Sequence, residues 1–516
     1  MTARTVMIQG TGSSVGKSLI ATGLCRLFRR AGLTVAPFKA QNMALNSAVA
    51  DGGGEIGRAQ AVQAEAAEIA PSVEINPILL KPEGNTCSQV VVLGRPVGSM
   101  SACEYHARKQ ELTGVIADAL EKLRDRVDLV VIEGAGSPAE VNLKDRDIVN
   151  MHVAHLADAP VLLVGDIDRG GVFASLVGTM ELLDAEERVR VAALVVNKFR
   201  GDRRLLEPGL EFLERRTGVP LLGVLPHLPN LRIADEDSVS LDERRERQAG
   251  PGELEIAVVR LPHISNWDDF ESLEHEAGVA VRYATSPDEL ARADLAVLPG
   301  SKCTARDLAW LRESGMAASI AARGAQARPV LGVCGGCQML GQQLFDPERI
   351  EFSSQRVEGL GLLPLRTRFL RDKTTAQICA RLATTSLFGK RDAPVSGYEI
   401  HMGLVEQLPA AVPSLQILSR NGVPCREPDG AVAAGGAVTG TMVHGLFESE
   451  QVRSALLDWL RSSRGLCRPD APAVPTRDAE YDRLARSLLC HLDWRLLCQI
   501  LGLALAPPLL GDLAGS

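Results

Sequence analysis

The stretch VMIQGTGSSVGKSLIATGL, residues 6–24, places an apolar run, a glycine-rich turn and a helical run in immediate succession. A strand that enters a glycine loop ending in Gly-Lys-Ser and continues as a helix is typical of a phosphate-binding loop. Backbone N–H groups of such a turn, together with the positive end of the helix, can surround phosphate oxygens. The stretch therefore predicts a nucleotide-binding α/β domain. The alternative is a plain strand-to-helix turn with an exposed lysine.

The loop positions can be assigned roles one by one. Lys17 would bridge the β and γ phosphates of ATP, and Ser18 would be a ligand of Mg²⁺. We expect ATP binding by Gly10, Thr11, Gly12, Gly16, Lys17 and Ser18.

The sequence of the phosphate-binding loop departs from the commonest pattern. Thr11 stands five positions before Gly16, where the common pattern has glycine. The partition and septum-placement ATPases have a second lysine at the position of Gly12, so a switch ATPase of that class is disfavoured. The loop resembles that of dethiobiotin synthetase, in which ATP phosphorylates a carboxylate-like oxygen. This resemblance implies that ATP activates a carboxylate.

Further along, short β-rich runs alternate with helical segments up to about residue 226, which predicts a parallel sheet covered by helices. A charged, Pro/Gly-bearing stretch then indicates a linker, and a second α/β series follows. The remainder has helical spacing and is expected to pack on the second domain. The predicted parts are 1–235, the phosphate-binding-loop domain; 236–252, the linker; 253–450, the second α/β domain; and 451–516, a helical C-terminal extension.

Several polar residues end apolar runs of the first domain, at the sheet edge where ligands collect. Glu133 ends LVVIE and could hold Mg²⁺ opposite Ser18, or else be a helix-capping or solvated acid. Asn197 ends VAALVVN and offers a donor and an acceptor for an adenine edge, although a plain turn residue is nearly as good an interpretation. Four aspartates stand beside basic residues and could form either a site or ion-paired loops: Asp145, Asp147, Asp166 and Asp168.

The second α/β series contains RPVLGVCGGCQMLG, residues 328–341. Gly-x-Cys-x-Gly after an apolar strand is the thiol form of a nucleophile elbow, which aims a helix N-terminus at Cys334 and lowers the pKa of the thiol. Cys334 and Cys337 also form a CxxC, which leaves a redox pair or half a zinc site as alternatives.

A thiolate nucleophile requires a base, and VTGTMVHGLFES offers His444 after another apolar strand. The turn LPGSK, residues 298–302, would donate the backbone N–H of Gly300 to an oxyanion, together with that of Gly335. These groups predict acyl transfer from an amide, and the residue they suit is glutamine.

Length and composition limit the number of domains and the kinds of partner. With 516 residues, of which 46% are hydrophobic, the chain predicts two or three domains. A net charge of −8 and 4% aromatic residues argue against nucleic acid as a partner. Eleven cysteines without a secretion signal favour reduced thiols. No apolar run reaches the ~20 residues of a membrane span, so we expect a cytoplasmic protein without a membrane partner.

In combination, these motifs resemble the cobyric acid synthase family, the glutamine-dependent amidotransferases of cobalamin biosynthesis. The resemblance covers essentially the whole chain and rests on GTGSSVGKS, FKAQNMALNS, EINPILLKP, VIEGAGSPAEVNLKDRDIVNM, GDIDRGGVFAS, VNKFRGD, HISNWDDFESL, VCGGCQMLG, GYEIHMG and GTMVHGLFE. It implies a class I-type glutamine amidotransferase fold for the second domain. It also adds Lys39 and Asn42 of the FKAQNM motif to the candidates for substrate activation.

The activity implied by this resemblance is amidation of carboxylates b, d, e and g of adenosylcobyrinic acid a,c-diamide. ATP and Mg²⁺ would drive it, glutamine would supply ammonia, and the cobalt corrinoid would be the substrate. The nearest alternative is cobyrinic acid a,c-diamide synthase, although FKAQNM and VNLKDRDIVNM favour the later enzyme. A switch ATPase with a degenerate glutaminase domain is the alternative of another class.

Two positions depart from related patterns. Many triad glutaminases have Glu two residues after the histidine, but that residue is Leu446 here and Glu448 is two further on. We therefore expect a Cys–His dyad, as the resemblance also implies. Cys337 replaces an aromatic residue of the family pattern, which favours an accidental CxxC.

Overall fold

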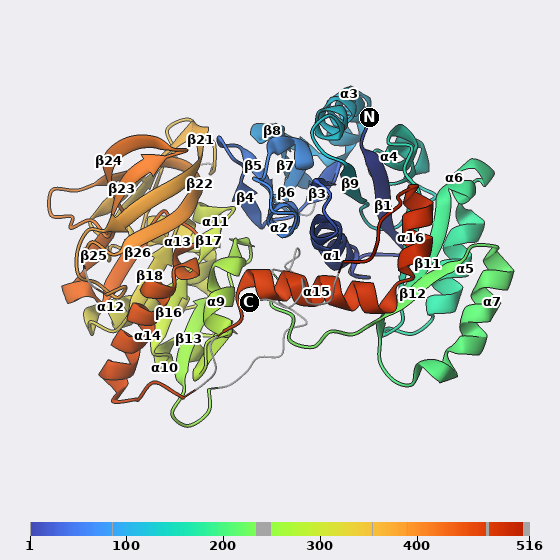
Figure 1. The fold of residues 1–516 in the computed structure, drawn as a ribbon. Helices are drawn as coiled ribbons and strands as arrows, with labels where there is room; N and C mark the ends of the chain where they lie inside the picture. The colour runs from blue at the N-terminus through green and yellow to red at the C-terminus, as the bar shows by residue number, and fades with distance from the viewer. Residues whose placement is uncertain are drawn as a thin grey trace.

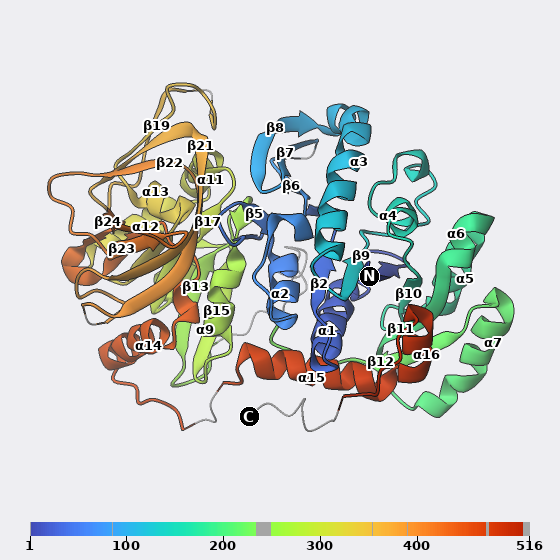
Figure 2. The same ribbon diagram turned by 45° about the horizontal axis from the view of Figure 1, so that its top comes forward.

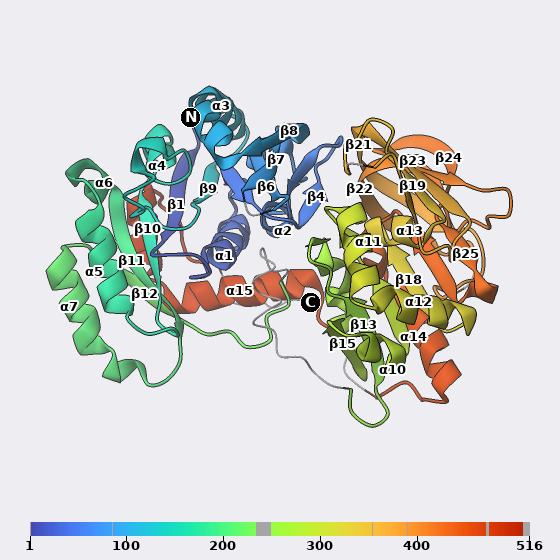
Figure 3. The ribbon, with the colours of Figure 1, turned by 180° about the vertical axis from the view of Figure 1, so that it is seen from behind.

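The computed structural model describes residues 2–84, 86–233, 249–352, 354–389, 391–470 and 474–508. Two α/β bodies lie side by side, with the helix α15 (Arg477–His491) crossing beneath α1 (Lys17–Arg30) of the first body (Figure 1). The same contact is seen from above in Figure 2 and from behind in Figure 3. Of the linker expected at 236–252, residues 236–248 lie outside the described residues.

The main sheet of the first domain has six parallel strands in the order β12-β11-β10-β1-β9-β2. Its central strands are buried along almost their whole length, because helices cover both faces. The strands are β1 (Arg4–Gly10), β2 (Val35–Phe38), β9 (Leu129–Glu133), β10 (Val161–Asp166), β11 (Val191–Phe199) and β12 (Leu221–Pro226). The helices besides α1 are α3 (Ala102–Arg124), α4 (Met151–Leu156), α5 (Val172–Leu182), α6 (Ala185–Arg190) and α7 (Glu207–Thr217).

An insertion between β2 and α3 lies between the main sheet and the second domain (Figure 1). It contains a four-stranded sheet in the order β3-β6-β7-β8, the hairpin β4–β5 and the helix α2. The elements are β3 (Gln41–Met43), β4 (Ser47–Val49), β5 (Glu55–Gly57), α2 (Arg58–Ala66), β6 (Ile78–Pro82), β7 (Cys87–Val92) and β8 (Arg95–Ser101). Ser101 and Glu104 form a capping box that ends the insertion and starts α3.

The second domain combines a sheet in the order β15-β13-β16-β18-β26-β25 with an antiparallel-rich sheet built around β21 and β22. The strands are β13 (Leu254–Val259), β14 (Ile264–Ser265), β15 (Val279–Ala284), β16 (Leu295–Leu298), β17 (Gly300–Ser301), β18 (Val330–Val333), β19 (Gln343–Phe345), β20 (Arg356–Glu358), β21 (Leu365–Leu382), β22 (Pro394–Gln407), β23 (Leu415–Arg420), β24 (Val423–Asp429), β25 (Ala431–Ala433) and β26 (Val438–Thr441). The helices are α9 (Glu271–Glu274), α10 (Pro287–Arg292), α11 (Thr304–Glu313), α12 (Met316–Ala325), α13 (Gly335–Leu340) and α14 (Glu450–Arg464). In the described part of the chain, no helix is both long enough and apolar enough to span a membrane.

The expectation that the C-terminal extension packs on the second domain is wrong for its last two helices. α14 joins the core of the second domain, but α15 and α16 (Trp494–Leu501) pack on α1 and β12 of the first. The rings of Phe28 and Trp494 lie 5.4 Å apart, and Leu488 fills the space above Gly23, where a Cβ would lie 2.5 Å from its Cδ1. Helical spacing predicts a buried face but not which surface buries it.

A buried ion pair joins α15 to α1. The Arg26 guanidinium, 1% exposed, donates from Nε to Asp482 Oδ1 at 2.7 Å, and the Asp482 side chain is 4% exposed. Arg26 also contacts Glu68 at 3.0 Å and Asp478 at 2.9 Å, but the Asp478 side chain is 72% exposed. Removing one partner of a buried ion pair leaves an uncompensated charge. Loss of Asp482 should therefore lower the free energy of unfolding more than loss of Asp478.

We expect Asp482→Ala to lower the free energy of unfolding by about 3 kcal/mol, because Arg26 stays buried without its best-placed partner. The exposed Asp478→Ala is the matched control and should cost less than about 1 kcal/mol. Urea denaturation of both variants measures the difference. Equal effects of the two substitutions would contradict this account of the contact.

Candidate functional site

The phosphate-binding loop begins where β1 ends and closes on the first turn of α1. Gly16 caps the helix at a φ of 99°, a conformation that favours glycine, and a Cβ there would lie 2.2 Å from Asn197 Nδ2. The Lys17 ammonium donates to the carbonyls of Gly12 at 2.8 Å and Gly136 at 3.0 Å. The lysine therefore bridges the segments that follow β1 and β9.

Packing restricts the remaining loop positions. A Cβ on Gly10 would lie 2.4 Å from Val15 Cγ2, and the Thr11 N–H continues the strand pairing by donating to Val164 O at 2.9 Å. Asn197 Nδ2 donates to Val15 O at 2.8 Å, so this end of the amide braces the loop. Its predicted contact with adenine stays a prediction.

Glu133 is the residue at which the polar side chains of the first site meet. It ends β9, is 1% exposed, and accepts at Oε1 from Ser18 Oγ at 2.8 Å and Lys39 Nζ at 2.9 Å. Its Oε2 accepts from Gln63 Nε2 at 2.6 Å. These donors offset the cost of burying a carboxylate. A hydroxyl beside a carboxylate, next to a phosphate loop, supplies the oxygen ligands that Mg²⁺ takes, so Ser18 and Glu133 fit that ion.

Two further candidates lie near this site. Asn42 Nδ2 donates to Gln60 Oε1 at 2.9 Å, on the same helix as the Gln63 that contacts Glu133. Asp166 ends β10 and pairs with Lys198 at 2.8 Å, and the Lys198 ammonium also donates to the loop carbonyl of Ser14 at 2.7 Å. Asp166 is thereby linked to the phosphate-binding loop.

Two of the other three aspartates have local partners instead. Asp168 pairs with Arg200 at 2.9 Å on the surface. Asp147 accepts the backbone N–H groups of Val149 and Asn150 at 2.9 Å, just before α4, and Asp145 is exposed in the preceding turn. The structure therefore brings Lys39, Ser18 and Glu133 together, but it leaves Asp147 capping the backbone before α4, Asp168 in a surface ion pair and Asp145 exposed.

In the second domain, Cys334 occupies a strained turn between β18 and α13. Its φ of 51° and ψ of −112° are rare for a residue with a side chain, and its N–H donates to Thr441 O at 2.8 Å. Gly336 permits the turn, because a Cβ there would lie 2.0 Å from Leu298 O. The strand, strained turn and helix form the geometry of a nucleophile elbow.

His444 follows β26 and contacts a carboxylate that the sequence did not point to. Its Nδ1 lies 2.6 Å from Asp269 Oδ2, and the Gly445 N–H donates to Asp269 Oδ1 at 2.8 Å. The Tyr398 ring stacks on the imidazole with centroids 5.2 Å apart. The expectation of a Cys–His dyad is therefore corrected, since a third group, Asp269, orients the histidine.

The charges around His444 alter its proton affinity. Burial acts to lower its pKa, but the charges of Asp269 and Cys334 and hydrogen bonds to both side chains outweigh burial and raise this pKa well above its usual value. A raised pKa favours an imidazolium beside the thiol, which is the partner that a thiolate needs.

Sequence reasoning missed Asp269 because it lies 175 residues before His444. The available signal was NWDDF, residues 266–270, in which two adjacent acids stand between two aromatic residues. Both acids are buried there, and burial of a carboxylate demands a partner.

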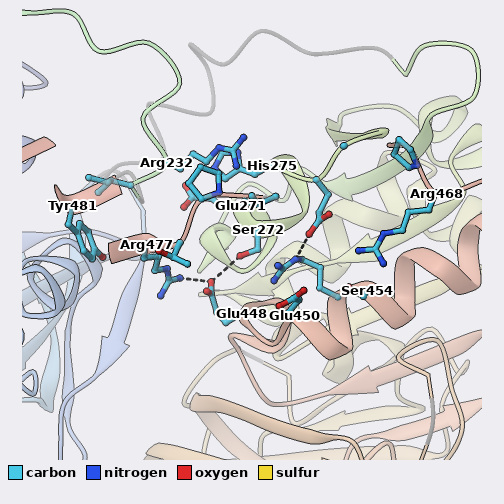
Figure 4. Close-up of a pocket in the computed structure, with 18 of the residues that line it drawn as sticks. Arg232, Glu271, Ser272, His275, Glu448, Glu450, Ser454, Arg468, Arg477 and Tyr481 are labelled. Carbon is cyan, nitrogen blue, oxygen red and sulfur yellow. Dashed lines mark hydrogen bonds and ion pairs between the residues drawn. The ribbon is translucent and has the colours of Figure 1, made fainter. Parts of the chain in front are cut away.

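Glu448, the nearest acid after His444 in the sequence, points elsewhere. Figure 4 shows it in a pocket of about 570 Å³ between the domains, bonded to Arg477 and Ser272. The ion pair with Arg477 measures 2.5 Å and the contact with Ser272 measures 3.3 Å. The carboxylate beside His444 is thus Asp269, which is distant in the sequence, and not the nearby Glu448.

The predicted oxyanion positions lie against the same residues. A Cβ on Gly300 would lie 3.1 Å from His444 Cε1, and one on Gly335 would lie 2.9 Å from the Ser301 nitrogen. Cys334 lines a cavity of about 40 Å³, whose wall includes Lys81 of the first domain. Cys337 is fully buried in the hydrophobic core.

Fold and geometry together define a class of protein: a phosphate-loop nucleotide-binding domain joined to a glutamine amidotransferase domain. The model for the "CobQ/CobB/MinD/ParA nucleotide binding domain" matches residues 6–241, and the "CobB/CobQ-like glutamine amidotransferase domain" matches residues 255–452. The α/β fold class predicted for both domains is confirmed.

The chain belongs to the cobyric acid synthase family, as its motifs predicted. It is 60% identical to the cobyric acid synthase of Sorangium cellulosum over 98% of this chain and 99% of that protein. The cobyric acid synthase of Pelotomaculum thermopropionicum is 50% identical, over 97% of each chain. That of Desulforamulus reducens is 49% identical, over 98% of this chain and 99% of its own. The family is one of glutamine-dependent, amide-forming ligases, which excludes the switch ATPase.

We expect Asp269→Asn to lower kcat for glutamine hydrolysis by on the order of 10²–10⁴-fold, because the amide cannot hold the imidazolium in place. Loss of the carboxylate also lowers the pKa of His444. The imidazolium then loses its proton at lower pH, so the alkaline limb of the pH profile of kcat/KM should move to lower pH. Glu448→Gln is the control and should leave both the rate and that limb in place. An unshifted limb in Asp269→Asn would contradict the assignment.

Proposed function

We propose that this protein amidates the b, d, e and g carboxylates of adenosylcobyrinic acid a,c-diamide, with ammonia from glutamine and energy from ATP. Two features support the proposal. The family is that of the cobyric acid synthases, and the chain combines a phosphate-binding loop with a buried Cys334, His444 and Asp269 arrangement. The latter is the single observation that carries the glutamine-hydrolysing half. The substrate is then a small corrinoid in the cytoplasm, and neither nucleic acid nor membrane is required.

The ammonia-producing half follows from the geometry around Cys334. Its thiolate would attack the side-chain carbonyl of glutamine, while the backbone N–H groups at Gly300 and Gly335 stabilise the oxyanion. His444 would give a proton to the departing nitrogen, which leaves as ammonia as the C–N bond breaks, and the γ-glutamyl group remains on Cys334 as a thioester. Water, deprotonated by His444, would then release glutamate and restore the thiol.

The activating half uses the first domain. Lys17 and the loop N–H groups would hold the phosphates of ATP and neutralise the charge that develops as the γ-phosphoryl group passes to a substrate carboxylate. Ammonia would attack the resulting acyl phosphate, giving the amide and phosphate. Lys39, whose ammonium lies 2.9 Å from Glu133 Oε1, would bind the substrate carboxylate or a phosphate oxygen. One chain carries both halves because ammonia released into water would be protonated.

Ser18 and Glu133 are the residues we propose to hold Mg²⁺. When bound, the ion would offset the negative charge of the phosphates. Lys39 and Gln63 orient the Glu133 carboxylate from its other sides.

We expect Cys334→Ala to lose glutamine-dependent synthesis by roughly 10³–10⁶-fold while retaining synthesis from added ammonium salt, since the thiol serves only to release ammonia. Cys337→Ala is the matched control and should do little, because its thiol is packed in the core. Amide formation is measured with glutamine and with ammonium chloride at alkaline pH, where more ammonia is unprotonated. If Cys337→Ala lost glutamine-dependent synthesis while Cys334→Ala kept it, Cys334 would not be the nucleophile. The CxxC would then have to be a redox or metal-binding pair.

We expect Lys17→Ala to lose synthesis with either nitrogen source, by about 10²–10³-fold, because it removes a charge that stabilises phosphoryl transfer. Glutamine hydrolysis by the variant should remain, which separates this defect from that of Cys334→Ala. Mass spectrometry of the corrinoid product is the measurement. Near-normal amide formation by Lys17→Ala would remove this residue from the ATP site.

A further inference from the structure

The turn that carries Asp269 is held by the first domain as well as by its own. Asn266, at a φ of 53°, donates from Nδ2 to the backbone carbonyl of Ser47 at 2.7 Å and to Tyr398 Oη at 2.9 Å. The Trp267 N–H donates to Asn46 Oδ1 at 3.3 Å. Ser47 and Asn46 belong to the insertion of the first domain, so two residues in succession before the acids are docked across the interface.

The third residue of the turn is docked by an ion pair. Asp268 Oδ2 lies 2.9 Å from Arg58 Nε, with the Asp268 side chain 3% exposed and the Arg58 side chain 13% exposed. Burial raises the pKa of Asp268, and the charge of Arg58 opposes that change. Asp268 is the neighbour of Asp269, whose two oxygens contact His444 and Gly445. A shift of Asp268 must therefore move the acid that orients the histidine.

The helix α2 that begins at Arg58 also reaches the nucleotide site. One turn and a half further along, Gln63 donates to Glu133 Oε2 at 2.6 Å, and Gln60 accepts from Asn42. Arg58, at the start of this short helix, therefore contacts the turn of the glutaminase acid, and Gln63, in its second turn, contacts the proposed metal ligand. The helix α2 thus connects Glu133 with Asp268, so a movement at Glu133 can reach Asp268 through it.

Polar groups along this path are incompletely paired. Gln63 Oε1, Gln60 Nε2, Asn46 Nδ2 and Asp268 Oδ1 are buried and lack a hydrogen-bond partner within the described ranges. Gln60 and Gln63 are fully buried. Buried polar groups are normally paired, and a partly satisfied network can gain bonds by exchanging partners. The unpaired atoms leave this path with hydrogen-bonding capacity that a change of partner at Glu133 can engage.

We propose that Arg58 is a positioning residue for glutamine hydrolysis, and that α2 links Asp269 to the occupancy of the nucleotide site. The inference rests on the proposed function of both sites. When Glu133 engages a metal-bound nucleotide, its bond to Gln63 changes, and α2 alters the hold of Arg58 on Asp268. Hydrolysis of glutamine is then fastest when a carboxylate can be activated, which limits the loss of ammonia.

The test measures glutamate release by the full-length protein with saturating Mg²⁺ and a non-hydrolysable ATP analogue, and without them. The wild type should respond to the nucleotide in kcat. Arg58→Ala should lower kcat for glutamine hydrolysis by about 10²-fold with little change in KM, as expected when a catalytic group is displaced by about 1 Å, and should lose the response. Arg58→Lys keeps the charge and should restore part of both. Ammonia-dependent synthesis should stay near normal in these variants.

Arg477→Ala is the matched control, because Arg477 also crosses the interface but contacts Glu448 and Glu65, not the turn of Asp269. It should keep both the rate and the nucleotide response. A wild type without a nucleotide response, or an Arg58→Ala that retains it, would overturn the link. Loss of ammonia-dependent synthesis in Arg58→Ala, or a defect in Arg477→Ala as large as in Arg58→Ala, would show a general effect on the fold or interface and overturn the positioning role. Failure of the proposed function would instead appear in Cys334→Ala.

Discussion

In the proposed mechanism, the glutaminase half depends on the contact between the Asp269 carboxylate and Nδ1 of His444, and residues of the first domain hold the turn that carries Asp269. A carboxylate on Nδ1 directs the other ring nitrogen towards the nucleophile and stabilises the imidazolium. The turn that supplies this carboxylate is docked on Ser47, Asn46 and Arg58 across the interface. The second domain therefore has its nucleophile and base by itself, while the place of its acid is set by its neighbour.

Buried ion pairs also cross the interface. Glu55 of the first domain lies fully buried between Lys81 of the same domain and Lys373 of the second, and Lys302 pairs with Glu83 at 2.8 Å. Burial lowers the pKa of Lys373 to about 8. Buried pairs of this kind recover little more than their desolvation cost, so they are weak evidence for stability. They do disfavour alternative docking positions, because any displacement leaves a buried charge unpaired. Such an interface fixes the position of the two domains relative to each other, which the proposed transfer of ammonia between the sites requires.

Much of both sites could be predicted from the sequence, because their motifs are local. The loop ending at Lys17 and the turn at Cys334 each need glycines at fixed spacing between a strand and a helix. Each motif can therefore be recognised within one short segment of the sequence. Glu133 and His444 follow apolar strands, and the parallel topology brings such strand ends together at one edge. The last two helices of the tail were assigned to the wrong domain, since the apolar face of α15 has the same spacing whichever partner covers it.

The sequence by itself determined the two α/β domains, the phosphate-binding loop, the nucleophile and its histidine, because each depends on spacing within a short segment. Only the tertiary structure decided the acid beside His444, the partners of Glu133 and the return of the last helices to α1. Asp269 and Glu448 are both acids in helical turns, and only packing shows that one reaches the imidazole at 2.6 Å while the other bonds to Arg477. The physical reason is that a carboxylate is oriented by the groups that compensate its burial, and those groups lie far away in the chain.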